Sequence, residues 1–437
     1  MREINITADE LVASLLHISE TECICLLDSC GVGHLGSHLL IAGIDPVDSV
    51  EISHDDPAET LAKIDALTSS DLACIFSISY EFGQKLIGLK AREKKPADGL
   101  EPDIFIASFD VLVIHNYDTG KTFLTGNPEK FDSVSEKLSA DLKSTVFDAP
   151  NTKVNVTSNF NRSSYIEAIQ TIKERIRSGD TYQTNLTQQL TAVLPENLSP
   201  QQLFWRLRRD HPAPFAAFLK RHDSSVVSAS PERFFKIAND RSISTSPIKG
   251  TRPRGSTADE DKALRHELLT SEKDRAENTM IVDLLRNDLG RVCEYGSVEV
   301  EMLCELEEHP TFFHLVSTVN GKLREKIKIS EILRAVFPCG SITGAPKIST
   351  MRIIDEIETA SRGLSMGAIG YSIRNSRFEI PNGIDLSVAI RTAVIRDQTM
   401  TFNVGGGIVI DSDPESEYDE TLTKAKALLA AIDGKLS

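Results

Sequence analysis

The sequence S-T-S-P-I-K-G-T-R-P-R-G, residues 244–255, is the stretch around which we expect this chain to be organised. Pro247 stiffens the backbone before Lys249, and Gly250 permits unusual backbone angles after it. A lysine held on a stiff, mostly apolar segment cannot swing freely into solvent, and burial disfavours its charged form. A partly neutral amine is a nucleophile, so Lys249 is a candidate for covalent catalysis. The alternative is an ordinary surface lysine on an edge strand.

The composition is that of a globular, acidic protein. Of the 437 residues, 40% are hydrophobic and 26% are charged, and the formal net charge is −16. Such a chain lacks the basic face that a nucleic-acid or anionic-membrane binder needs, so we expect neither kind of partner. An acidic protein that handles a small anion must gather its cations locally. The cluster of Lys249, Arg252 and Arg254 meets that need.

Cysteine usage and the N-terminus both indicate a reducing, cytoplasmic setting. The seven cysteines are scattered and form no C-x-x-C pair, which predicts neither a disulfide framework nor a zinc ribbon. The first 20 residues lack the basic and apolar regions of a signal peptide. No apolar run approaches the roughly 18 residues of a membrane-spanning helix.

A polar stretch over residues 148–161 predicts a linker between two regions, 1–150 and 160–432. The first region contains a predicted helix at 58–67 and β-prone runs at 24–27, 38–41 and 105–114.

Three helices are predicted in the second region. In the first, Ser164 and Glu167 form a capping box, apolar residues repeat at helical spacing, and Gly179 ends the helix. The second covers 271–292, and the third begins at Pro414 behind Asp413.

Two of these helices carry acidic faces. Asp274 and Glu277 share a face of the second helix, and Glu417, Glu420 and Lys424 share a face of the third. Glu277 and Glu420 are candidate ligands for Mg²⁺, which prefers a few carboxylates with water and ligand oxygens. The alternative is two solvated acidic faces that never meet.

Glu232 follows Pro231 and precedes Arg233 and two phenylalanines. Apolar surroundings raise a carboxyl pKa and suit a general acid. A turn glutamate paired with Arg233 is the alternative.

Three elements in the C-terminal half are candidates to receive an anion. Gly405, Gly406 and Gly407 would expose successive backbone N–H groups as a carboxylate nest. Arg391 would clamp a carboxylate through two parallel hydrogen bonds, and Lys424 lies one turn beyond Glu420. A tight turn, a salt bridge and a solvated lysine are the respective structural alternatives, and His314 is by default a strand histidine.

Nine segments, in this order, carry a family resemblance: GDTYQTNLTQ, SASPERF, PIKGTRPRG, EKDRAENTMIVDLLRNDLGR, HLVSTVNG, FPCGSITGAPK, GAIGY, DLSVAIRT and GGGIVIDSDPESEYDETLTKA. Together they resemble the chorismate-utilising enzymes, which include anthranilate, isochorismate, salicylate and aminodeoxychorismate synthases. The N-terminal region matches more weakly, through residues 26–29 and 79–81. The resemblance implies an α+β fold of two large, mainly antiparallel sheets packed as a sandwich with flanking helices, to which the N-terminal region adds strands.

The resemblance also implies a role for each matching residue. Lys249 would attack chorismate and Glu232 would act as general acid. Mg²⁺ would be held by Glu277 and Glu420, with Glu417 and Asp274 nearby. The substrate would be bound by Thr251, His314, Thr343, Tyr371, Arg391, Lys424 and the backbone of Gly405, Gly406 and Gly407.

Two positions separate the branches of the family. Thr184 stands where isochorismate and salicylate synthases carry a water-activating lysine, which argues against water addition. Lys249 replaces an alanine of anthranilate and isochorismate synthases and is typical of the aminodeoxychorismate synthase branch, which leads to para-aminobenzoate and folate. No glutaminase motif is visible, so the pattern implies ammonia delivery by a separate glutamine amidotransferase subunit.

Two alternatives stay open at this stage. The arginine of GTRPRG is commoner among anthranilate synthases, which makes anthranilate synthase component I the second candidate. The third is a catalytically idle regulatory protein that binds chorismate or tryptophan. The chain also departs from the family pattern at Cys339, where glycine is usual, and at Ser365, where tyrosine is frequent.

Overall fold

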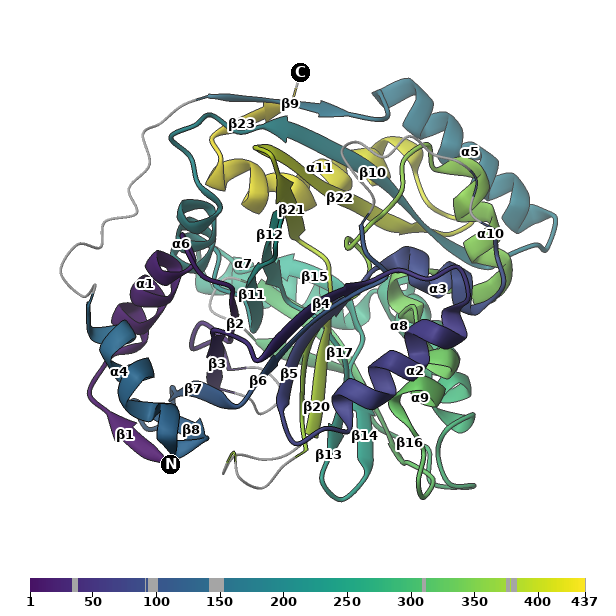
Figure 1. Ribbon diagram of the computed structural model, residues 1–437. Coiled ribbons are helices and arrows are strands. Elements are labelled where there is room, and N and C mark those ends of the chain that lie inside the picture. The colour runs from purple at the N-terminus through teal and green to yellow at the C-terminus, as the bar shows by residue number, and fades with distance from the viewer. Residues whose placement is uncertain are drawn as a thin grey trace.

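The computed structural model describes residues 1–33, 38–90, 92, 101–140, 153–308, 312–374, 378 and 383–436. Figure 1 shows two large β-sheets with helices around them. The predicted α+β fold is confirmed. In the described part of the chain the sheets have 13 and 10 strands, and all their ladders are antiparallel except that of β9 with β23.

The larger sheet runs in the order β1 (Arg2–Ile4), β8 (Lys121–Gly126), β7 (Val111–Asn116), β3 (Leu39–Ile44), β2 (Ile24–Asp28), β11 (Phe215–Lys220), β12 (Ser224–Ser230), β21 (Thr392–Arg396), β22 (Thr399–Ile408), β10 (Gln183–Val193), β9 (Val154–Ser158), β23 (Gly434–Leu436), with β18 (Gly344–Ala345) on β10. The smaller sheet runs in the order β15 (Ile248–Pro253), β17 (Phe312–Lys322), β14 (Ser242–Thr245), β13 (Arg233–Ala238), β20 (Gly383–Val388), β19 (Ala368–Ile373), β5 (Ala73–Ile78), β6 (Ile104–Phe109), β4 (Asp48–Ile52), with β16 (Glu299–Glu308) on β17.

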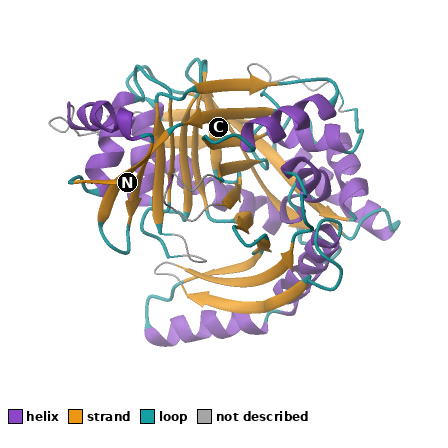
Figure 2. Cartoon of the chain, turned by 60° about the horizontal axis from the view of Figure 1, so that its bottom comes forward, coloured by secondary structure: helices purple, strands orange, loops and turns teal. Residues whose placement is uncertain are grey.

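Helices cover the outer faces of both sheets, as Figure 2 shows. They are α1 (Ala8–Ile18), α2 (Pro57–Thr68), α3 (Tyr80–Leu86), α4 (Phe131–Ala140), α5 (Arg162–Arg177), α6 (Pro200–Asp210), α7 (Ala258–Thr270), α8 (Glu272–Gly290), α9 (Ile329–Val336), α10 (Lys347–Ile357) and α11 (Pro414–Ala431), with short 3₁₀ turns η1 (Pro128–Lys130) and η2 (Gly340–Ile342). Of the helices described, none is long and apolar enough to cross a membrane.

Each sheet contains a block of strands from the first half of the chain and a block from the second half, joined at one ladder. β2 lies between β3 and β11, and β5 pairs with β19. The expectation that the N-terminal region adds strands to the same sandwich is therefore confirmed. The predicted linker at 148–161 is wrong over part of its length, because β9 (Val154–Ser158) is a strand of the larger sheet. Residues 141–152 lie outside the described ranges, and the division into regions 1–150 and 160–432 stays a prediction.

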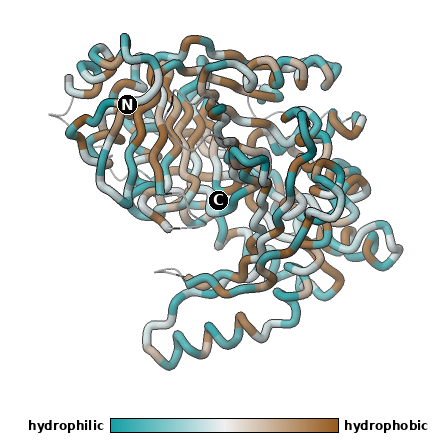
Figure 3. The backbone as a smooth tube through the Cα atoms, turned by 90° about the horizontal axis from the view of Figure 1, so that it is seen from below, coloured by the Kyte–Doolittle hydropathy of each residue, from teal (hydrophilic) through white to brown (hydrophobic). Residues whose placement is uncertain are grey.

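The apolar core has three main parts. One packs the larger sheet against α1, α4, α6 and α11, and another packs the smaller sheet against α2, α8, α9 and α10. The third lies between the sheets, where residues such as Ile41 and Phe105 meet. Figure 3 shows the hydrophobic residues concentrated along the strands. All seven cysteines are free, as expected from their spacing.

The predicted strand at 105–114 is in fact two strands. β6 ends at Phe109 and belongs to the smaller sheet, whereas β7 begins at Val111 and belongs to the larger one. Asp110 lies between them, where the chain passes from one sheet to the other. The β-prone run therefore concealed a change of sheet at Asp110, because the strands on either side are both buried and have similar sequences.

Most predicted helix boundaries agree with the structure. Ser271 caps α8, and Asp413 caps α11 with Pro414 at the first position. The start of α5 was predicted too late, because the true capping box joins Asn161 to Ser164. Gly179 follows the end of α5 with a φ of 80°, a left-handed conformation that favours glycine.

Candidate active site

Lys249 lies on β15, at the edge of the smaller sheet, where β15 pairs with β17. The ladder shifts register at Gly250, which has a φ of 80°. A Cβ at Gly250 would lie 3.0 Å from the side chain of Asp274 on α8. The glycine therefore gives the strand both the bulge and the close approach to α8 that set Lys249 beside this helix.

Lys249 is half-buried, and its charge acts on the carboxyl groups of Glu232, Glu277 and Glu420. These four residues, which we name the Lys249 cluster, come from β15, the β12–β13 turn, α8 and α11. The segment was expected to be mostly apolar around Lys249. The structure instead brings the amine within electrostatic reach of three carboxyl groups, because long-range packing places two acidic helix faces near it.

Glu232 is the most buried carboxyl of this cluster, with 6% of its surface exposed. Burial raises its pKa, against the opposing effects of the Ser341 hydroxyl and the charges of Lys249 and Lys424. Its Oε1 atom has no hydrogen-bond partner among the described residues. Arg233 forms a bidentate pair with Asp385, at 2.9 and 3.0 Å, which argues against the alternative of a Glu232–Arg233 pair.

Glu277 makes no hydrogen bond or ion pair within the described part of the chain, and burial raises its pKa, opposed mainly by Lys249. Glu417 is buried and accepts hydrogen bonds from the Ser412 hydroxyl at 2.7 Å and from Lys273 at 3.4 Å. Burial acts to raise the pKa of Glu420, but the Lys424 ammonium, 2.8 Å away, lowers it.

These carboxylates only partly fit the predicted metal site. Among the residues that the structure describes, no group of three or more His, Cys, Asp and Glu side chains is arranged to hold a metal ion. Asp274 is paired with Arg252 at 3.2 Å. The oxygens of Glu277 and Glu420 are nevertheless the donors that Mg²⁺ accepts together with water and ligand oxygens. Magnesium binding stays a prediction.

The three glycines do not form the predicted nest. Gly405, Gly406 and Gly407 are extended residues of β22 and pair with β10. A Cβ at Gly406 would lie 3.3 Å from Glu417 Oε2 and 3.6 Å from Lys424 Nζ, and one at Gly407 would lie only 2.0 Å from an atom of the Gln183 amide. Their function in the fold is to leave room, because each missing side chain lets a polar group approach the strand.

Arg391 and Lys424 are the two cations that were expected to bind the carboxylates of the substrate. Arg391 lies just before β21, with its carbonyl bonded to Ala229 on the strand that leads to Glu232. Burial lowers the pKa of its guanidinium, and no ion pair to it occurs within the described ranges. Lys424 Nζ donates to the carbonyl of Gly405 at 2.9 Å. A half-buried arginine without a counter-ion is suited to receive a carboxylate.

Thr251 and His314 bond to each other, with 2.9 Å between Oγ1 and Nδ1. They are directly opposed on β15 and β17, one ladder step beyond Lys249. Thr343 is fully buried, and its hydroxyl donates to the carbonyl of Cys339 at 2.9 Å. Its side chain therefore stabilises the turn at residues 339–343, and it affects the site only through the conformation of that turn.

Tyr371 lies away from the Lys249 cluster. It shares a face of β19 with Ile369, and that face points between the two sheets, where Tyr371 lines a separate cavity of about 50 Å³ with Asp28 and Phe215. Burial raises the pKa of its hydroxyl above the ordinary range. The predicted substrate contact is not supported by this position, because strand alternation directs the ring to the sheet interface.

Three further residues belong to the site but were not predicted. The Gln183 side chain lies over Gly407, is 1% exposed and has an unpartnered Oε1 within the described structure. Ser341 lies beside Glu232, and Lys273 acts on Glu417 and Glu277. Of these three, only Lys273 could have been predicted from the sequence, because residues four apart on one helix lie next to each other and Glu277 follows it by four.

Thr184 is fully buried on β10, and its hydroxyl has no partner in the part of the chain described. It pairs with Ile408 and with Gly344 across the two neighbouring strands. Its place beside Gln183 puts it at the edge of the glycine strand.

The chain belongs to the chorismate binding enzyme family, whose model matches residues 23–430. Its residues are 46% identical to an aminodeoxychorismate synthase of Streptomyces griseus over 272 residues, which is 62% of this chain and 36% of that protein. They are 45% identical to an anthranilate synthase component 1 of Haloarcula marismortui over 274 residues, 63% of this chain and 53% of that one. The matches thus span about a third to a half of these relatives.

A solved structure has the same fold over nearly its whole length. Anthranilate synthase component I from Streptococcus pneumoniae superposes with a TM-score of 0.76 and 26% identity, covering 91% of this chain and 93% of that one. The fold expected from the resemblance is thereby confirmed, and the protein is a chorismate-binding enzyme by family.

Proposed function

We propose that this chain is component I of an aminodeoxychorismate synthase, which converts chorismate and ammonia to 4-amino-4-deoxychorismate for para-aminobenzoate and folate synthesis. Overall identity does not distinguish this branch from anthranilate synthase, because both kinds of relative match equally well. The observation that supports the proposal is the position of Lys249 among Glu232, Glu277 and Glu420.

In the first step, Lys249 Nζ forms a bond to C2 of chorismate while the bond from C4 to its hydroxyl oxygen breaks. Glu232 gives its proton to that oxygen, which leaves as water. A buried carboxyl with a raised pKa holds a proton at neutral pH more often than an exposed one, so Glu232 suits this task.

In the second step, the nitrogen of ammonia bonds to C4 and the bond from C2 to Lys249 breaks. Lys249 leaves as an amine, and the excess proton of the added ammonia returns to Glu232. Covalent catalysis in this form replaces one difficult displacement by two easier ones.

Glu277 and Glu420 would hold Mg²⁺, with Glu417 nearby. When bound, the ion would supply positive charge for the ring carboxylate of chorismate and would offset the negative charge of the cluster. Glu277 is the best placed of these ligands, since no cation of the described chain pairs with it directly.

Arg391 and Lys424 would bind the carboxylates of the substrate. Arg391 is half-buried and has no counter-ion in the described part of the chain, whereas Lys424 is bonded to Gly405 and Glu420 and can turn its remaining proton to a ligand. Gln183 offers a further unsatisfied amide at the same strand.

Ammonia would come from a separate glutamine amidotransferase. The proposed site offers groups that would bind and protonate chorismate, and the amino group of the product has to come from outside it. The partner is thus expected to supply nitrogen, and this chain to supply the site at which it is used.

The test is incubation with chorismate, Mg²⁺ and an ammonium salt, followed by chromatographic separation of the products. We expect 4-amino-4-deoxychorismate without pyruvate, and none of it when ammonium is omitted. Chorismate binding without turnover would contradict the proposal and support an idle binding protein.

The second candidate is anthranilate synthase component I. It is supported by the anthranilate synthase relatives, which match this chain as well as the aminodeoxychorismate synthases do. Formation of anthranilate and pyruvate in the same assay would favour it over the first proposal.

A further inference from the structure

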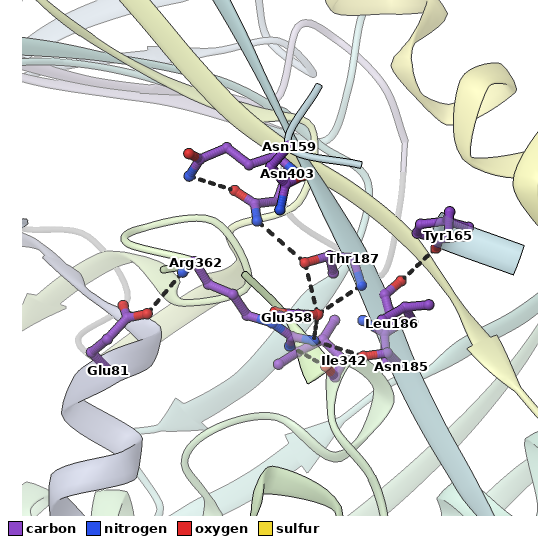
Figure 4. A network of polar contacts seen from close by, with 11 residues as sticks. Glu81, Asn159, Tyr165, Asn185, Leu186, Thr187, Ile342, Glu358, Arg362 and Asn403 are labelled. Atoms are coloured by element: carbon purple, nitrogen blue, oxygen red, sulfur yellow. Dashed lines mark hydrogen bonds and ion pairs between the residues drawn. The ribbon is translucent and has the colours of Figure 1, made fainter. Parts of the chain in front are cut away.

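A second set of charged residues lies on the far side of β10 from α11 (Figure 4), and its central members are buried. Its centre is Arg362, whose side chain is 1% exposed and is paired with Glu358, 2% exposed, at 2.8 Å. The guanidinium also lies 4.4 Å from the ring of Tyr80. We name Arg362, Glu358, Tyr80 and Glu81, with the groups they bind, the Arg362 network.

The Arg362 guanidinium bridges two segments that border the Lys249 cluster. It donates to the carbonyl of Ile342 at 2.9 Å and to the carbonyl of Asn185 at 2.6 Å. Its other bonds go to both oxygens of Glu358, at 2.9 and 2.8 Å. A planar group with five fixed N–H directions can hold these acceptors at once, which a lysine cannot do.

Glu358 continues the bridge along β10. It accepts the backbone N–H of Thr187 at 2.7 Å and the hydroxyl of Thr187 at 2.9 Å. Asn403 on β22 donates to the same hydroxyl at 3.2 Å. The network therefore fixes β10 at the residues that pair with Gly405 and Gly407.

The N-terminal region closes the network from the other side. Glu81 accepts the backbone N–H of Arg362 at 2.8 Å, and the N–H of Tyr80 donates to the carbonyl of Gly363 at 2.8 Å. Helix α3 thereby holds the backbone on both sides of the arginine. The position of the guanidinium is set by packing as well as by its bonds.

The two bridged segments carry groups of the proposed reaction. Ile342 stands between Ser341, which lies beside Glu232, and Thr343, whose carbonyl accepts the N–H of Asn185 at 2.8 Å. Asn185 follows Gln183 and Thr184 on β10. Arg362 touches none of the reacting groups, yet it joins the turn beside the general acid to the strand beside the glycines.

We infer that Arg362 is a positioning residue for the proposed reaction: it holds the Ser341 turn against β10, and so keeps the proton of Glu232 aligned with the substrate. This inference rests on the proposed function of Glu232 as general acid. Misplacement of a reacting group by about 1 Å costs on the order of 10²-fold in rate.

The test compares Arg362→Lys with Arg221→Lys. Arg221 is a matched control because its side chain is fully buried, pairs with Glu101, donates to Ser77 at 2.8 Å and lies over a phenylalanine ring, but bridges neither segment. Disappearance of chorismate is followed whatever the product, and melting temperatures are recorded for both variants.

For Arg362→Lys we expect kcat to fall by about 10²-fold, with a KM for chorismate within about threefold of the parent's, because the proposed substrate contacts are intact. Arg221→Lys should show a similar change in melting temperature and a kcat within about twofold of the parent. Equal losses of kcat in both variants would overturn the inference.

Amide hydrogen exchange gives a readout that does not depend on turnover. The N–H of Asn185, bonded to Thr343, should exchange at least about tenfold faster in Arg362→Lys than in the parent, and at the parental rate in Arg221→Lys. Unchanged exchange at Asn185 in Arg362→Lys would overturn the inference. A parent that forms anthranilate would contradict the proposed function and leave this comparison intact.

If Arg362→Lys does not fold, the double variant Arg362→Met/Glu358→Gln removes both buried charges together. It should keep the fold and show the same loss of kcat and the same faster exchange at Asn185. A double variant with parental kcat would show that the network has a structural role only.

Discussion

The Lys249 cluster and the Arg362 network lie close to the same strand, β10, but differ in how their polar groups are satisfied. In the network, both oxygens of Glu358 and three nitrogens of Arg362 are bonded to protein groups. In the cluster and beside it, the described structure leaves Glu232 Oε1 and Gln183 Oε1 without partners, and Glu277 without any hydrogen bond.

This difference separates supporting residues from residues that await a ligand. An unsatisfied buried polar group costs about 1–3 kcal/mol, so several of them in one place need a reason. A bound substrate that supplies the missing partners is such a reason, and the cluster is therefore the place to expect it. In the network, the Arg362–Glu358 pair at its centre is fully bonded to protein groups, whereas the Tyr80 hydroxyl at its edge has no partner in the described part of the chain.

The largest effect is expected for Lys249→Ala. Removal of the nucleophile should lower the rate of 4-amino-4-deoxychorismate formation by at least about 10⁴-fold, because the remaining residues cannot form the covalent bond. Intact-protein mass spectrometry during turnover should detect an adduct in the parent and none in the variant. An active variant would show that the cluster uses no covalent step.

For Glu232→Gln we expect kcat to fall by about 10²–10⁴-fold while chorismate still binds, since the amide cannot donate the proton to the leaving hydroxyl.

The same substitution should not lower the stability of the fold above the pH at which Glu232 loses its proton. The pKa of Glu232 is raised in the folded state, mainly by burial, so the parent loses stability as pH rises from the unfolded value of about 4.5 through the folded value. Above that window the variant should be at least as stable as the parent, which denaturant unfolding at pH 5 and pH 8 would measure.

In the network, Glu358→Ala should destabilise the fold by about 3–5 kcal/mol, because it leaves the Arg362 guanidinium buried without its counter-ion. Urea denaturation monitored by circular dichroism would give this value. The comparison with Glu277→Ala, which removes a carboxyl that has no ion pair, should show a much smaller loss of stability and a larger loss of activity. Equal destabilisation by both variants would contradict the distinction between the two clusters.

The smallest effect is expected for Arg391→Lys. Replacement of a planar guanidinium by a single ammonium should raise the KM for chorismate by about 10–100-fold, because hydrogen bonds to charged groups contribute about 1.5–3 kcal/mol. Steady-state kinetics at saturating ammonium would measure it, with kcat changed little. A parental KM would place the substrate's carboxylates elsewhere.

Local features of this fold could be predicted from the sequence, because they depend on residues close together in the chain. The cap at Asp413, the glycine after α5 and the shared face of Glu417, Glu420 and Lys424 are of this kind. The ordered motifs then brought Lys249, Glu232 and Glu277 together by resemblance.

Features set by distant pairing could not be predicted. At Asp110 the chain passes from the smaller sheet to the larger one, within a run that the sequence predicts as a single strand. On β19, the alternation of side chains directs Tyr371 into a cavity away from the Lys249 cluster. The three consecutive glycines predict a carboxylate nest when they are considered alone. Their sequence does not indicate that they pair with β10 and are therefore extended. Nothing in the local sequence identifies Gln183 as a site residue. Its side chain reaches the site because Gly407, on the neighbouring strand, has no side chain in its way.

The joining of both sheets from two halves of the chain has a practical consequence for dissecting this enzyme. A fragment that began at residue 153 would lose β2 from beside β11 and β5 from beside β19. The edges of β11 and β19 would then carry unpaired backbone N–H and C=O groups, and such edges pair readily with strands of other molecules. The catalytic half expressed alone should therefore associate with itself rather than remain monomeric, and co-expression with the first 140 residues should suppress that tendency.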